Sequence, residues 1–146
     1  MLADCYMAES KFYKVVAILK DCKTDANRYK FALSCMKISK FKEGEKALLG
    51  AEAIKSDKDY SAIPNGSYGL YLLGCITEKD HRYTEAKAYY QKALEINPTL
   101  WCAYEKLGKL GENTLPSKVF TDTKMKGYET SKRPGNTPVA TRRSAK

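Results

Sequence analysis

Apolar residues recur every three or four positions along most of the first 120 residues, which is the spacing of one face of an α-helix. The five prolines all stand at the boundaries of these stretches, where the missing N–H and the ring of proline are tolerated. The pattern therefore predicts an all-α chain. Its helices are expected at about residues 1–9, 11–22, 25–38, 41–54, 67–79, 83–96, 99–111 and, as a short one, 116–123.

Three of these segments repeat one arrangement. Each begins with an apolar residue followed by a small one, and nine residues after the small one comes the aromatic member of a basic-aromatic pair. The pairs are Lys11-Phe12, Lys40-Phe41 and Arg82-Tyr83. A fourth segment begins 34 residues after the third, and 34 is the period of the tetratricopeptide repeat. The longest connection is expected in 55–67, and the start in mid-repeat at Leu2 indicates a shortened first helix or a missing N-terminal piece.

The third segment matches the repeat best, with Gly or Ala wherever two antiparallel helices must approach and a bulky residue opposite. We therefore expect a tetratricopeptide-repeat superhelix of antiparallel helix pairs over 1–120. Trp101 has two open roles, an interface anchor or the cap of the last regular repeat, and its place after Asn-Pro favours the cap. The predicted repeat-packing residues are Ala3, Ala32, Gly44, Leu73, Gly74, Ala86, Tyr90, Ala93, Pro98 and Trp101.

The net charge of +9 raises the question of a nucleic-acid partner, so the location of the charge matters. From residue 121 onward there are seven basic residues and two acidic ones, together with proline, glycine, serine and threonine. Residues 121–146 therefore indicate a basic flexible tail or linker. The repeats themselves lack the basic groove that RNA-reading repeats use. No stretch resembles a membrane or secretory segment, so neither a nucleic acid nor a membrane is expected as partner, and the chain is expected to be intracellular.

The sequence contains little that indicates a catalytic site or a metal site. The single histidine, His81, falls in a predicted turn between charged neighbours, where a solvated side chain is expected. No phosphate-binding loop, metal triad or suitably spaced carboxylate pair is present, so we expect no enzyme, metal site or cofactor. The cysteines are odd in number and contain no Cys-x-x-Cys pair, which favours buried, reduced thiols at Cys5, Cys22, Cys35, Cys75 and Cys102.

Two sequence segments indicate which family of tetratricopeptide-repeat proteins the chain resembles. Residues 39–48 (SKFKEGEKAL) and 97–101 (NPTLW), the latter continuing through 104–107 (YEKL), Gly111-Glu112 and Phe120, resemble the scaffold subunit of the anaphase-promoting complex, a ubiquitin ligase. Gly44 is part of this resemblance, although glycine costs about 1 kcal/mol in a helix interior and the repeat prefers alanine. The resemblance covers about 2–120 and is to the N-terminal, self-associating domain. The chain lacks the C-terminal repeats that receive coactivator tails in that family, so coactivator capture is not implied.

The resemblance implies a non-catalytic scaffold module that forms a homodimer, helps assemble the complex with its other subunits, and lies in nucleus and cytoplasm. The repeat frame places groove positions on the first helix of each pair, and these are aromatic, aliphatic or soft side chains typical of interfaces. The predicted dimer interface is Tyr29, Leu33, Met36, Tyr68, Tyr71 and Cys75. Each tyrosine could instead pack only within its own repeat. The alternative function is a generic adaptor that binds a peptide or helix of another protein, although the cationic clamp for C-terminal carboxylates is missing from these positions.

Overall fold

The computed structural model describes residues 2–50, 60–112 and 115–120. These ranges contain eight α-helices, one short 3-10 helix and no strand, so the all-α prediction is confirmed. The elements are α1 (Leu2–Ala8), α2 (Phe12–Leu19), α3 (Asp25–Lys37), α4 (Phe41–Leu49), η2 (Tyr60–Ala62), α5 (Ser67–Lys79), α6 (Tyr83–Ile96), α7 (Trp101–Lys109) and α8 (Pro116–Val119).

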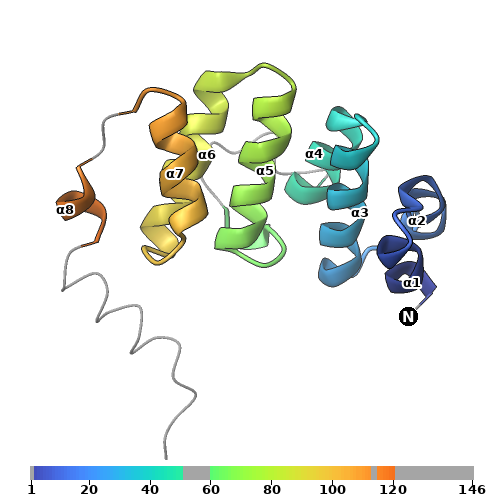
Figure 1. Cartoon of the computed structure of the whole chain (residues 1–146). Coiled ribbons are helices and arrows are strands. Elements are labelled where there is room, and N and C mark those ends of the chain that lie inside the picture. The colour runs from blue at the N-terminus through green and yellow to red at the C-terminus, as the bar shows by residue number, and fades with distance from the viewer. Residues whose placement is uncertain (1, 51–59, 113–114, 121–146) are drawn as a thin grey trace, which may run out of the picture.

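The helices stack in the order of the chain. From α1 to α7 each helix packs against the next, and α3 also contacts α5. Figure 1 shows α3, α5 and α7 side by side in the layer nearer the viewer, with α4 and α6 behind them. Antiparallel pairs that contact only their neighbours are the arrangement of a tetratricopeptide-repeat fold.

The repeated basic-aromatic pairs mark one recurring turn. Ser10, Ser39 and His81 precede those pairs and adopt left-handed backbone angles, with φ of 57°, 62° and 63°, and Gly111 does the same after α7 with φ of 79°. After each of them a backbone N–H donates to the carbonyl five residues earlier, as in a Schellman motif. These bonds run from Lys11 to Tyr6, Lys40 to Cys35, Arg82 to Thr77 and Glu112 to Leu107, at 2.8, 2.9, 2.9 and 3.0 Å.

Several predicted helix bounds were wrong. Helix α2 ends at Leu19 and not at 22, and residues 20 and 21 form a turn directly after it. Helix α4 ends at Leu49 because Gly50 adopts a φ of 77°, and residues 51–54 of the predicted helix lie outside the described residues. Helix α7 begins at Trp101 and not at 99, because the Asn97 side chain accepts bonds from the Thr99 amide (3.1 Å) and hydroxyl (2.6 Å).

At the C-terminal end α8 finishes at Val119, four residues before the predicted end at 123. Phe120 lies in a bend, and everything from 121 onward falls outside the described residues. The predicted tail at 121–146 therefore stays a prediction. Of the long connection expected at 55–67, residues 55–59 lie outside the described residues, and 60–66 form η2 and a turn before α5 begins at Ser67.

Two apolar clusters form the core. The larger one is centred on α5 and α6 and extends to α4 and α7, and the smaller one joins α1, α2 and α3. All but one of the predicted repeat-packing residues are buried, namely Ala3, Ala32, Gly44, Leu73, Gly74, Ala86, Tyr90, Ala93 and Pro98. The remaining one, Trp101, is 59% exposed.

Polar contacts tie neighbouring helices together. The Arg28 guanidinium on α3 donates to the carbonyls of Ala47 (2.9 Å) and Leu48 (3.0 Å), which are orphan acceptors at the end of α4. Arg82, before α6, forms a two-pronged ion pair with Glu45 of α4, with Nη1–Oε1 and Nη2–Oε2 distances of 3.2 and 2.5 Å. Because both contacts use fixed guanidinium geometry, Arg28 sets the orientation of α4 on α3 within one helix pair, and Arg82 sets the orientation of two consecutive pairs.

The expectation of buried cysteines was wrong for three of the five. Cys35 is buried and Cys75 is half-buried, but Cys5, Cys22 and Cys102 are exposed. Free cysteine is often buried in proteins, but these three cysteines lie on the solvent-facing sides of their segments. In the described ranges, no helix has both the length and the apolar character needed to cross a membrane.

Candidate interaction face

The six predicted interface residues lie on two helices of the nearer layer in Figure 1. Tyr68 is 47% exposed and stands at the start of α5. The other five are half-buried and pack against the larger core cluster. We call this set the tyrosine face: Tyr29, Leu33 and Met36 on α3, with Tyr68, Tyr71 and Cys75 on α5.

Electrostatics show that the two helices bring part of this set together. The pKa of the Tyr29 phenol is raised by burial and then by the proximity of Cys75 and Tyr68. The pKa of Tyr71 is raised by burial and by the neighbouring Cys75 thiol. Tyr29, Tyr68, Tyr71 and Cys75 therefore form one neighbourhood across α3 and α5.

Leu33 and Met36 belong to the same side of α3 as Tyr29, because residues three and four apart share a helix face. Their contacts are with the larger core cluster. They extend the tyrosine face along α3. Whether the face contacts a second molecule stays a prediction.

A polar network lies beside the tyrosine face. The Tyr71 ring packs on that of Tyr90 of α6, with centroids 5.7 Å apart. The Tyr90 hydroxyl donates to Glu78 Oε2 (2.5 Å) on α5, and Lys106 Nζ of α7 donates to Glu78 Oε1 (2.8 Å). Burial raises the pKa of the Glu78 carboxyl, but the bonds from Lys106 and Tyr90 outweigh it, so this pKa lies below its ordinary value. One carboxylate thus joins three consecutive helices.

Sequence reasoning missed Glu78 and Lys106. Glu78 comes three residues after Cys75, so helical spacing alone places it on the same side of α5. That signal was available. Lys106 is 28 residues away from Glu78, and no local pattern joins the two.

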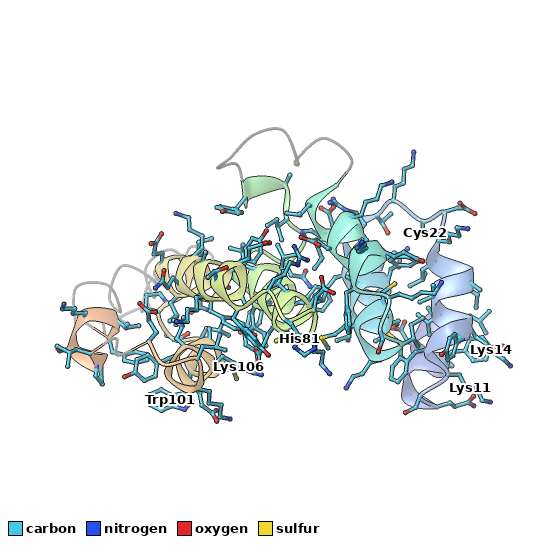
Figure 2. All side chains as sticks on the ribbon, turned by 90° about the horizontal axis from the view of Figure 1, so that it is seen from above. Lys11, Lys14, Cys22, His81, Trp101 and Lys106 are labelled. Carbon is cyan, nitrogen blue, oxygen red and sulfur yellow. The ribbon has the colours of Figure 1, made fainter. Side chains whose placement is uncertain are left out.

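An aromatic cluster closes the other end of the array. Trp101 stacks on Phe120 with ring centroids 5.6 Å apart and packs on Tyr104 at 5.2 Å. Figure 2 shows Trp101 at the end of the molecule opposite to Lys11, Lys14 and Cys22. The packing on Phe120, which follows α8, is what a cap requires, and the 59% exposure of Trp101 leaves surface for a partner. Both roles stay predictions.

Few groups in the described residues are arranged for chemistry. They contain no group of three or more His, Cys, Asp or Glu side chains placed to hold a metal ion. His81 is exposed in its turn, and its Nδ1 lies 3.1 Å from the Tyr83 hydroxyl. What the tyrosine face can do is bury aromatic and aliphatic surface against another molecule.

Comparison with known proteins agrees with the helical repeat. Residues 1–51 match the model of the family described as "Anaphase-promoting complex, cyclosome, subunit 3". The chain is 39% identical over 121 residues, or 82% of its length, to the Cell division cycle protein 27 homolog A of Arabidopsis thaliana. It is 33% identical over 135 residues, or 88% of its length, to the Cell division cycle protein 27 homolog of Homo sapiens.

These alignments cover only 16% of either relative, so the chain spans less than a fifth of their length. The match nevertheless includes most of the helices described above. Over most of its own length, the chain is a tetratricopeptide-repeat relative of the Cell division cycle protein 27 homologues and, in residues 1–51, of the subunit 3 family of the anaphase-promoting complex.

Proposed function

We propose that the chain is a non-catalytic scaffold module that pairs with a second copy of itself through the tyrosine face. In this role it helps to assemble the anaphase-promoting complex, the ubiquitin ligase of the cell division cycle. Other subunits of that complex are its further partners, and nucleus and cytoplasm are its sites of action. The names of the matched family and relatives support the complex and the process.

The observation that carries the self-pairing is the composition of the tyrosine face. Aromatic side chains from two consecutive repeats gather there, and Tyr68 leaves nearly half of its surface open, at 47%. Tyrosine and methionine are enriched at interfaces because they bury large areas at low conformational cost or repack easily. A two-fold contact uses the same patch of both molecules, so each exposed aromatic residue contributes buried surface twice to the dimer.

Sedimentation velocity of the 146-residue chain and its Tyr68→Glu variant tests this proposal. We expect a dimer mass for the parent and a monomer mass for the variant, with unchanged helical circular dichroism, because each dimer would bury two charges in an apolar contact. Tyr71 stays intact, since its packing on Tyr90 makes it part of the fold.

Tyr83→Glu is the matched control, because Tyr83 is 48% exposed, like Tyr68, and stands at the start of α6 outside the face. It should keep the dimer mass. A Tyr68→Glu chain that stays dimeric removes this face from the interface. A parent chain that is monomeric at micromolar concentration removes the self-pairing and favours the adaptor alternative.

A further inference from the structure

An open groove lies between α2 and α4. Helix α2 packs on α3 and α3 packs on α4, while α2 and α4 share no comparable contact, so α3 forms the bottom of the space between them. The groove has a volume of about 1340 Å³. Its floor is apolar and is made by Val16, Leu19, Phe31, Ala47 and Leu49.

This groove is separate from the tyrosine face. Phe31 lines the groove and Leu33 belongs to the tyrosine face, and residues two apart on a helix point to nearly opposite sides. An occupant of the groove therefore does not compete for the surface on the other side of α3.

The rim of the groove is basic. Among the described residues, five cationic side chains line it, and Glu43 is the one acidic lining residue. Two of the cations are already engaged, because Lys40 pairs with Glu43 (3.2 Å) and Arg28 binds Asp25 and the α4 carbonyls. The remaining three are Lys20, Lys23 and Lys46, which are exposed and form no ion pair with another described residue.

We propose that this basic groove is a docking site for an acidic amphipathic helix of another protein. Its volume exceeds the roughly 300–1,000 Å³ of small-molecule pockets. A helix that buries an apolar stripe in a groove between two helices is an established mode of recognition, and three lysines that pair with no described acidic residue select acidic flanks. A second copy of this chain, with a net charge of +9, is a poorer match in charge.

A nucleic acid fits the groove less well. Binding of single strands relies on aromatic platforms for the bases along a basic track. Here the floor is mainly aliphatic, and the aromatic lining residues within the described ranges are Tyr13 and Phe31, the latter buried. The aliphatic floor complements the leucine stripe of an amphipathic helix. The cationic rim complements glutamates that flank this stripe.

Fluorescence anisotropy with three labelled peptides and the full 146-residue chain tests the proposal. The first peptide is about four helical turns long, with leucine at i, i+3, i+4 and i+7 spacing and glutamate beside the stripe. The second has lysine in place of glutamate, and the third has the composition of the first in scrambled order. We expect the first to bind about tenfold more tightly than either control, and to weaken with added salt. Equal affinity for all three overturns the proposal.

Charge reversal locates the binding. The Lys20→Glu/Lys23→Glu/Lys46→Glu variant should bind the acidic peptide about tenfold more weakly, since several exposed ion pairs of modest strength are lost. Lys37→Glu/Lys42→Glu/Lys79→Glu is the matched control, because these lysines are exposed and outside the groove. Each change lowers the net charge by two, so both triple variants go from +9 to +3. An equal loss in both variants shows a general charge effect and overturns the proposal.

Two further measurements separate other occupants. Phosphatidylserine vesicles or a poly(U) strand that bind more tightly than the peptide, and depend on the same three lysines, would overturn the choice of a protein helix. Tyr68→Glu should leave peptide affinity unchanged, because Tyr68 is outside the groove. The proposal therefore stands or falls independently of the proposed self-pairing.

Discussion

A Cβ atom on Gly74 of α5 would lie 2.6 Å from Cε1 of Tyr90 of α6. Real Cβ atoms do not approach ring carbons so closely, so the two helices meet at a distance that only glycine permits. The Tyr90 ring has little freedom to withdraw, because it is fully buried and its hydroxyl is bonded to Glu78. The absent side chain at one position thus sets the spacing of a whole helix pair.

Replacing Gly74 with alanine should lower the free energy of unfolding by about 1–3 kcal/mol, the usual cost of overpacking a core. The gain in helix propensity, about 1 kcal/mol, is too small to offset a displaced ring. Urea titration followed by circular dichroism measures the change. Gly108→Ala is the control, since nothing lies within 4 Å of a Cβ atom there, and it should stabilise the chain. If both variants are stabilised, the contact with Tyr90 does not limit the helix spacing.

Ser39 occupies a left-handed turn position with a φ of 62°. Ser39→Gly should raise the free energy of unfolding by up to about 1 kcal/mol, because glycine adopts this conformation without the clash of a Cβ atom. The change is measured by thermal and urea unfolding. The reverse change, Gly111→Ser, falls in the equivalent turn after α7, with φ of 79°, and should destabilise the chain. Changes of the same sign in both variants would contradict the equivalence of the turns.

The Glu78 network makes a prediction about pH. Burial raises the pKa of Glu78, but bonds from Lys106 and Tyr90 hold it below its ordinary value of 4.5. A carboxyl with a depressed pKa in the folded state stabilises the fold above its unfolded pKa, and this stability is lost as the pH falls through the folded pKa. The parent chain should therefore exceed Glu78→Gln in unfolding free energy at neutral pH, and the difference should shrink below pH 4.5.

Urea titrations between about pH 7 and pH 3 measure this difference. In a Lys106→Met background the pH dependence should be weaker, because the cation that holds the carboxylate ionised is gone. A difference between parent and Glu78→Gln that stays constant over the whole range would show that the carboxylate charge does not contribute.

Much of the fold follows from patterns that are local in the chain. The turns between paired helices were found through the repeated pairs such as Lys40-Phe41, because a turn and the first residues of the next helix are set by neighbours in sequence. Helices α5 and α6 have the predicted bounds of 67–79 and 83–96. The end of α2 was missed because residues 20–22 continue in a polar run that a helix also tolerates.

Of the two interaction surfaces, the sequence predicted one and did not predict the other. The residues of the tyrosine face follow from the repeat frame, and the structure places Tyr68 close enough to Tyr29 to contribute to the raised pKa of the Tyr29 phenol. The basic groove was missed. Its floor combines Val16, Phe31 and Ala47 from three helices, and each of these residues looks like an ordinary core position in its own helix.

The amino-acid sequence by itself determined the helical class, the repeat and the faces of single helices, because a periodic pattern within one helix is enough to specify them. Only the tertiary structure decided the exposure of Cys5, the link from Lys106 to Glu78 and the open space between α2 and α4. These features depend on the distances and angles at which separate helices meet. Such geometry results from all packed side chains together, and no single stretch of the chain contains it.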